Sequence, residues 1–274
     1  HSTLLLRSFY RQFGTDVPKE YWSYARGDIS KAALFELYPQ QAQAAAAEAQ
    51  RIELGINPHQ EVKKLINQRL DGSEKWVLVG GPPCQAYSLV GRARMKKNNP
   101  DFEDDVRHFL YKEYLKIIAD HRPPVFVMEN VKGILSAQHS GANIIESILS
   151  DLRKPSVVVS GRKAGLRYKL YSLVDNKLPD DCEPEDFLVK AELYGIPQAR
   201  HRILILGVRD DIDITPEILQ KSDATTVAQA IGDLPKIRSR VSKEPDTLKL
   251  WQEILGSISS AAWYREGRKN GLAE

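Results

Sequence analysis

The sequence has 274 residues, of which 42% are hydrophobic and 27% charged, which is the ordinary composition of a globular protein with a sizeable core. The formal net charge of +3 permits an anionic partner without requiring one, because proteins that bind by charge alone are more strongly basic. Two cysteines without metal-ligand spacing, and no apolar run of membrane length, predict a cytoplasmic protein with no disulfide framework, no metal and no membrane partner.

Residues 1–72 are predicted to be mostly helical. Leu4, Leu5, Phe9 and Phe13 recur at near-helical spacing, and the segment from residue 14 to 18 breaks that pattern. We expect further helices from a cap at Asp28 or Ser30 to Tyr38, through the alanine-rich segment to Leu54, and from Asn57-Pro58 to Leu70.

The apolar run Trp76-Val77-Leu78-Val79 predicts a buried strand, which two glycines and two prolines then end. Cys84 therefore follows the carboxyl end of a strand, where ligands bind in open α/β sheets. A lone thiol at such a place is a candidate nucleophile, but free cysteine is also a common small buried hydrophobe. The local sequence leaves both interpretations open.

A run of positive charge follows the cysteine, with four cations between residues 92 and 97. Such a run is usually a solvated loop. Next to an active site, it is also suited to binding phosphates by charge.

Residues 104–121 have the apolar face of a helix, and Val125-Phe126-Val127-Met128 is a second predicted strand that ends before Glu129. Strand, helical crossover and strand form a βαβ unit, in which the two strands are parallel. Their carboxyl ends meet at one edge of the sheet, so Cys84 and Glu129 can face one crevice. The alternative is that Glu129 is a helix-capping or surface carboxylate.

Farther along the chain, Arg200 and Arg202 precede the apolar strand 203–208, and their spacing of two places both on one face. They can grip an anion or a carbonyl together, or they can flank the sheet in water. The intervening segment is predicted to contain a helix over 142–152, a basic turn over 153–167, a strand over 168–174 and a short helix over 184–193.

Three blocks resemble the signature motifs of the cytosine-C5 DNA methyltransferase family, in the same order and at these strand ends. They are Gly81-Pro82-Pro83-Cys84-Gln85-Ala86-Tyr87-Ser88, Glu129-Asn130-Val131 and Gln198-Ala199-Arg200-His201-Arg202. The resemblance covers roughly residues 76–208. It implies an α/β, Rossmann-like fold with a mostly parallel sheet flanked by helices, incomplete at both ends and preceded by an extra helical segment.

The resemblance also implies a reaction with S-adenosylmethionine as methyl donor and double-stranded DNA as substrate. Cys84 would attack C6 of a flipped-out cytosine, Glu129 would donate to N3, and Arg200 and Arg202 would bind the O2 edge. Pro83 and Leu110 are the expected cofactor contacts. The expected DNA contacts are Gln85, Ser88, Arg92 and Arg94.

The sequence departs from the family at both ends. We find neither the glycine-rich turn that holds the cofactor's methionine part nor the acidic residue expected on a second strand. We therefore expect a partial catalytic domain over 1–235, with a helical segment over 1–72 and a catalytic core over 73–210, followed at 236–274 by the start of a target recognition region. Two alternatives remain, namely a tRNA cytosine-C5 methyltransferase and an inactive DNA-binding remnant.

Overall fold

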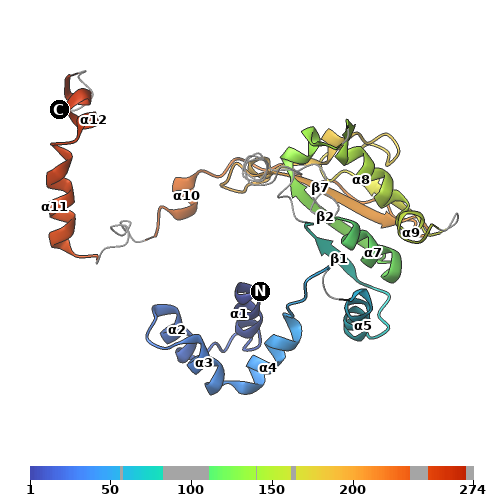
Figure 1. Ribbon diagram of the computed structural model, residues 1–274, viewed down its shortest axis with the longest axis horizontal. Helices are drawn as coiled ribbons and strands as arrows, with labels where there is room; N and C mark the ends of the chain where they lie inside the picture. The colour runs from blue at the N-terminus through green and yellow to red at the C-terminus, as the bar shows by residue number, and fades with distance from the viewer. Residues whose placement is uncertain (56–57, 83–110, 140, 162–164, 235–245, 270–274) are drawn as a thin grey trace. The chain divides into compact units, whose positions relative to one another are not determined.

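The computed structural model describes residues 1–55, 58–82, 111–139, 141–161, 165–234 and 246–269 (Figure 1). The chain divides into two compact units, His1–Ala224 and Thr225–Glu274. The functional boundary expected between residues 235 and 236 remains a prediction. None of the described helices is long and apolar enough to cross a membrane.

Helices precede the first described strand, as the sequence predicts. Phe9, Leu34 and Ala45 are fully buried among them, and the ring of Phe9 stacks on that of Phe35 at 4.5 Å. Of the two expected caps, Ser30 is the one whose hydroxyl accepts from the N–H of Ala33. The helices are α1 (Ser2–Arg11), α2 (Lys19–Arg26), α3 (Lys31–Leu37), α4 (Pro39–Glu48) and α5 (His59–Leu70).

A five-stranded sheet forms the centre of the first unit, with β1, β2, β7 and β5 in that order and β6 beside the start of β7. β1 and β2 are parallel, as the βαβ prediction requires, whereas β7 is antiparallel to β2, β5 and β6. β7 is thus the one strand of this sheet that runs against the others, and the predicted α/β class is confirmed. The strands are β1 (Val77–Gly80), β2 (Val125–Val131), β5 (Tyr168–Tyr171), β6 (Leu188–Lys190) and β7 (His201–Arg209).

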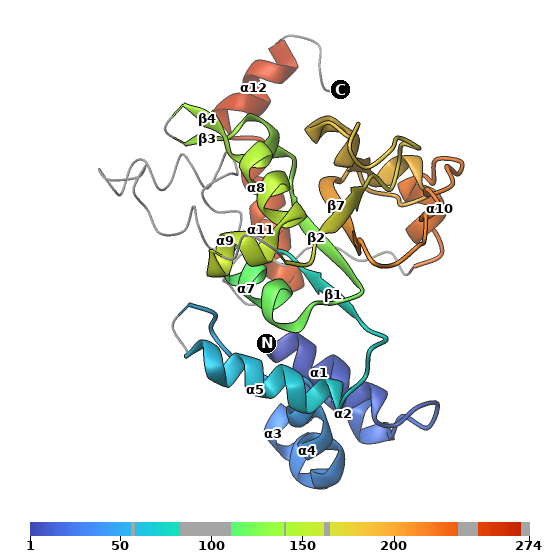
Figure 2. The same ribbon diagram turned by 90° about the vertical axis from the view of Figure 1, so that its right-hand side faces the viewer.

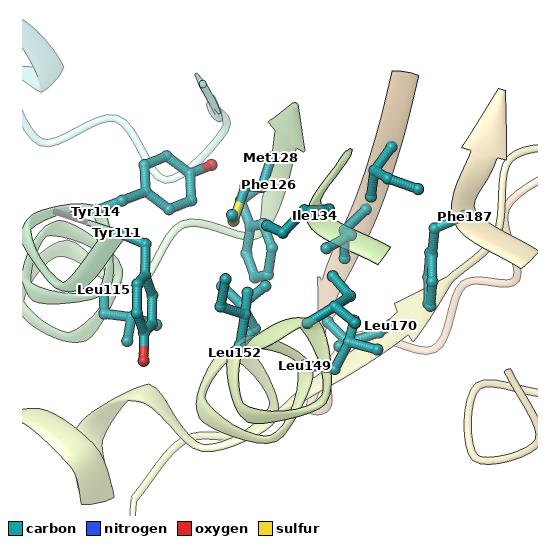
Figure 3. Close-up of a cluster of buried hydrophobic side chains, with 14 of the residues drawn as sticks. Tyr111, Tyr114, Leu115, Phe126, Met128, Ile134, Leu149, Leu152, Leu170 and Phe187 are labelled. Atoms are coloured by element: carbon teal, nitrogen blue, oxygen red, sulfur yellow. The ribbon is translucent and has the colours of Figure 1, made fainter. Parts of the chain in front are cut away.

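One face of this sheet is covered by α7 (Tyr111–His121), α8 (Ile144–Arg153) and α9 (Pro155–Ser160), which lie on the same side of β2 (Figure 2). Phe126 and Met128 of β2 point toward Leu115 of α7 and Leu152 of α8 in the hydrophobic core (Figure 3). The deep burial of these side chains fixes which residues of β2 face the helices.

The opposite face of the sheet is more open. Val77 and Val79 of β1 are 55% and 71% exposed, and Val127 and Leu204 on the neighbouring strands are only partly buried. The sheet therefore presents two different faces to its surroundings. The residues whose side chains point away from the helices are therefore available for a site on this open face.

Several predicted elements differ from the observed ones. The helix expected through the alanine-rich segment to Leu54 ends at Glu48, because Ala49 leaves the helical conformation. The expected helix over 184–193 is two short 3₁₀ turns, η4 (Pro184–Phe187) and η5 (Ala191–Leu193), around β6, because Leu188, Val189 and Lys190 pair with the start of β7. β5 ends at Tyr171. The hydroxyl of Ser172 accepts hydrogen bonds from the N–H groups of Val174 and Asp175, and these bonds turn the chain. The expected basic turn over 153–167 contains α9, which begins at Pro155.

The remaining described elements are short. β3 (Gln138–His139) and β4 (Ala142–Asn143) form a small hairpin, and η3 (Lys132–Ser136) follows β2. The second unit contains α10 (Val227–Ile231), α11 (Leu248–Ile258) and α12 (Ala262–Lys269).

Candidate active site

Glu129 lies within β2, on the sheet face that points away from α7 and α8. The strand alternates between partly buried and buried residues, and Glu129 is one of the partly buried set. The sequence predicts that the strand ends at Met128, and this is wrong by three residues. Glu129, Asn130 and Val131 pair with Leu204, Ile203 and Arg202 of β7, so the strand continues. The carboxylate is therefore placed by regular, paired backbone.

The two arginines predicted from their spacing both reach Glu129. Nε of Arg202 lies 2.9 Å from Oε1 of Glu129, and Nη2 of Arg200 lies 3.6 Å from the same oxygen. Arg202 is opposite Val131 in the β2–β7 register, and this pairing brings its side chain beside the carboxylate. The structure therefore unites three of the four predicted catalytic side chains in one cluster at the edge of the sheet.

The contact between Arg202 and Glu129 is an ion pair without a well-directed hydrogen bond. The Nε–H group is buried and has no acceptor in hydrogen-bond geometry, although the carboxylate is close. Nη1 of the same side chain donates to the carbonyl of His201 at 2.7 Å, which fixes the guanidinium on the backbone. Arg202 thus holds a positive charge in a fixed position beside the carboxylate of Glu129.

Gly81 brings the chain that leaves β1 against this cluster. A β-carbon at Gly81 would lie 3.0 Å from Oε2 of Glu129 and 3.5 Å from its carbonyl oxygen. Only a residue without a side chain fits this close approach unless the carboxylate moves. The sequence identifies the two glycines as a strand end, but their contact with Glu129 depends on the register of two strands and has no signal in the sequence.

Gly80, one residue earlier, likewise allows a close approach between neighbouring elements. A β-carbon there would lie 2.5 Å from the ring of Tyr114, whose hydroxyl donates to the carbonyls of Val127 at 3.1 Å and Leu78 at 3.3 Å. Burial raises the pKa of Tyr114, so the phenol remains a neutral donor. Tyr114 therefore connects α7 to both parallel strands next to the site.

A second pair supports the start of β7. Nε2 of His201 lies 2.6 Å from Oε1 of Glu192, and the N–H of Ala191 donates to the carbonyl of Arg200 at 3.0 Å. Hydrogen bonds from its own backbone N–H and from His201 lower the pKa of Glu192. These contacts hold the strand segment that carries both arginines. Glu192 was not among the residues predicted from the sequence.

The other predicted site residues lie outside the described residues. They are the nucleophile Cys84, the cofactor contacts Pro83 and Leu110, and the DNA contacts Gln85, Ser88, Arg92 and Arg94. Their roles remain predictions. Chain geometry still limits the distance between the Cα atoms of Gly81 and Cys84, because only three positions separate them and an extended chain spans at most about 3.6 Å per residue.

The described residues offer no obvious place for two kinds of bound group. They contain no cluster of three or more His, Cys, Asp or Glu side chains that could hold a metal ion. Among them we also find no glycine-rich turn between a strand and a helix that would cradle a nucleoside cofactor.

Residues 40–160 and 182–259, well over half of the chain, match the family described as C-5 cytosine-specific DNA methylase. A type II methyltransferase of Bacillus paralicheniformis is 27% identical over 235 residues, which cover 80% of this chain and 47% of that protein. One from Brevibacillus brevis is 35% identical over 57% of this chain and 34% of its own. The chain thus spans about half or less of the length of these relatives.

A solved structure of a DNA modification methyltransferase encoded within an E. coli prophage is also similar to this chain. It is 23% identical, with a TM-score of 0.43, and the match covers 67% of this chain and 42% of that one.

Proposed function

Because the chain belongs to the C-5 cytosine-specific DNA methylase family, we propose that it carries the base-activating site of a DNA cytosine-C5 methyltransferase. In this proposal Cys84 is the nucleophile, Glu129 binds the N3 edge of the cytosine, and Arg202 with Arg200 binds its O2 edge. The methyl donor is S-adenosylmethionine, which supplies an electrophilic methyl group when bound.

The ion pair of Arg202 with Glu129, at the strand end that Gly81 approaches, is the observation that supports this proposal best. A cytosine ring presents a carbonyl oxygen, a ring nitrogen and an amine along one edge. A guanidinium group can donate to the carbonyl, and a carboxyl group can both donate to the nitrogen and accept from the amine. The thiol must approach from the opposite side of the ring, and Cys84 follows closely after Gly81 in the chain.

The chemistry requires each of these groups. The Cys84 thiolate adds to C6, and the electron pair of the C5–C6 bond moves into the ring, where Glu129 and Arg202 stabilise the charge. C5 is then nucleophilic and would accept the methyl group that bound S-adenosylmethionine supplies, with a neutral thioether as the leaving group. Loss of the C5 proton and rupture of the S–C6 bond restore the aromatic ring and release the thiolate.

DNA is the proposed substrate because the matching family is described as a cytosine-specific DNA methylase. We propose that the reaction takes place in the cytoplasm. C6 is inaccessible in a stacked duplex, so the target base must leave the helix. Gln85, Ser88, Arg92 and Arg94 are proposed DNA contacts, and Pro83 and Leu110 are proposed cofactor contacts. No described residue favours the tRNA alternative.

An isotope-exchange experiment tests the base-activating step separately from methyl transfer. Addition of a thiolate to C6 allows C5 to take a proton from solvent, and reversal of the addition returns cytosine with an exchanged C5–H. DNA with tritium at C5 of cytosine should therefore release the label into water. The assay uses the protein as the cell produces it, with and without S-adenosylmethionine.

Cys84→Ser and Glu129→Gln should reduce label release by about a hundredfold or more, while DNA binding in a mobility-shift assay is retained. Glu146→Gln provides a matched control, because Glu146 is an exposed residue of α8 that accepts a hydrogen bond from Asn143. Undiminished label release by Cys84→Ser would overturn the proposed mechanism.

A further inference from the structure

Two lysines lie on the two sides of Arg202, at the end of the sheet that carries the candidate site. Arg202 pairs with Val131 of β2 on one side and with Val189 of β6 on the other. Both strands are antiparallel to β7, so they run in the same direction, and each of the two valines is followed by a lysine, Lys132 or Lys190. The lysines therefore flank the arginine, one residue beyond the level at which it pairs.

The spacing of the strands limits how far apart these lysines are. Neighbouring strands are about 4.8 Å apart, so the Cα atoms of Val131 and Val189 lie about 10 Å apart across β7, and the lysines that follow them have a similar separation. One DNA strand advances about 3.4 Å along the helix axis per nucleotide, so this span corresponds to about three nucleotides. The long lysine stems allow the two ammonium groups to approach each other more closely.

The charge of these lysines is not compensated by a described residue. Both are exposed, and neither forms an ion pair within the part of the chain that the structure describes. The carboxylates that contact the start of β7 already have partners, because Glu129 lies 2.9 Å from Nε of Arg202 and Glu192 lies 2.6 Å from Nε2 of His201. The two ammonium groups are therefore available to an anion from outside the chain.

Exposed lysines often carry only a solvated charge, and on an edge strand they also prevent association between sheets. The position of this pair indicates a further role, because it flanks the guanidinium that binds the cytosine in the proposed function. A cytosine that has left the duplex remains joined to its strand. The phosphates next to that cytosine must therefore lie at the mouth of the site, between or beside the two lysines.

We propose that Lys132 and Lys190 bind the backbone phosphates next to the target cytosine. This inference rests on the proposed function, which places that cytosine at Glu129 and Arg202. Each ammonium group donates to a phosphate oxygen and replaces a counterion of the DNA. The lysines then fix the position of the DNA strand, whereas the carboxylate and the guanidinium contact the base.

The salt dependence of DNA binding measures such contacts. Binding of a fluorescent, mixed-sequence duplex to the protein as the cell produces it is followed by anisotropy at about 50 to 200 mM salt, because phosphate contacts do not depend on sequence. Each contact contributes about 0.9 to the slope of log Kd against log salt concentration. Lys132→Gln and Lys190→Gln should each lower this slope by about 1, and the double variant should lower it by about 2.

Two further variants separate charge from structure. Lys132→Arg and Lys190→Arg keep the positive charge, so the slope should remain that of the parent. Lys64→Gln is the matched control, because Lys64 is an exposed lysine of α5, which precedes β1 in the chain. Its slope should also equal that of the parent.

Label release from tritiated DNA tests whether the bound phosphates are next to the target base. At low DNA concentration, the double glutamine variant should release label about tenfold more slowly than the parent. Most of this loss should be recovered at saturating DNA, because a phosphate contact contributes to binding and takes no part in the addition to C6.

An unchanged salt slope in the double glutamine variant would overturn the inference. A lower slope without a loss of label release at low DNA would also overturn it, because the lysines would then bind DNA away from the target base. A loss of Tm that also occurs in the arginine variants would show that the lysines support the fold. Failure of the proposed function is recognised separately, because Cys84→Ser would then still release label whatever the salt slopes.

Discussion

Arg202 and Glu129 lie on neighbouring antiparallel strands, with Nε of the arginine 2.9 Å from Oε1 of the glutamate. The arginine is fixed by its own hydrogen bond to the carbonyl of His201, so the pair does not depend on two freely moving side chains. The buried Nε–H nevertheless lacks an acceptor. The arrangement therefore compensates the charge of Glu129 with a guanidinium that is held in a fixed position.

Replacing Arg202 with lysine should impair base activation while it leaves the fold intact. An ammonium group cannot bind the His201 carbonyl and also present a second, fixed donor. We expect label release to fall by about a hundredfold, and the free energy of unfolding to change by about 1 kcal/mol or less, because the pair is partly exposed. Arg200→Lys should have a smaller effect, since Arg200 is 3.6 Å from Glu129. Equal losses in both variants would contradict this division of roles.

Gly81→Ala should disturb the site more than the fold. The added methyl group would lie 3.0 Å from Oε2 of Glu129, so the carboxylate has to move. We expect about a tenfold loss of label release, with an unfolding midpoint in urea close to that of the parent. A fully active Gly81→Ala variant would show that the position of Glu129 is not critical.

The sequence predicts the elements that carry this site because they are strongly patterned. The apolar runs at 76–79, 125–128 and 203–208 coincide with β1, β2 and β7, and the spacing of Arg200 and Arg202 is consistent with their shared approach to Glu129. Periodicity predicts the first helix, and capping and helix-forming residues predict α3, α4 and α5, whereas α2 lies in a segment between the predicted helices.

What the sequence does not predict depends on pairing between distant segments. β6 is three residues long and exists because it pairs with β7, and its local sequence alone suggests a helix. The extension of β2 through Glu129 has the same cause. The close approach of Gly81 to Glu129 follows from the register of two strands, which no local pattern encodes.

Gly207→Ala should destabilise the core through one identified contact. A β-carbon at Gly207 would lie 2.2 Å from the ring of Phe126, which is itself fully buried. Overpacking of this kind costs about 1–3 kcal/mol, measurable by urea unfolding. Phe126→Leu removes the obstructing ring, so the double variant should lose less stability than the sum of the two single variants. Additive losses would show that the backbone, and not the ring, limits this site.

The 274-residue chain by itself should bind S-adenosylmethionine weakly or not at all. The described residues contain no glycine-rich turn of the kind that holds a nucleoside cofactor in open α/β sheets. Isothermal titration calorimetry of the chain should give no saturable heat at micromolar concentrations of the cofactor, while the protein remains folded by circular dichroism. Micromolar affinity would mean that the cofactor is held by residues that the sequence does not reveal.

Glu192→Gln should change how stability depends on pH. The pKa of Glu192 in the folded protein lies below its ordinary value of 4.5, because hydrogen bonds from its own backbone N–H and from His201 favour the carboxylate. A depressed folded-state pKa adds stability that is present above the unfolded-state pKa and is lost as the pH falls toward the folded-state value.

The Tm of the parent should therefore exceed that of Glu192→Gln at pH 6, and the difference should shrink as the pH falls from 5 to about 3. Glu146→Gln, which makes the same chemical change at an exposed position of α8, serves as the control. A difference in Tm between parent and Glu192→Gln that is independent of pH would show that Glu192 acts through packing and not through its charge. The pair of Glu192 and His201 also holds the segment that carries Arg200 and Arg202. Glu192→Gln should therefore lose label release in parallel with its loss of Tm.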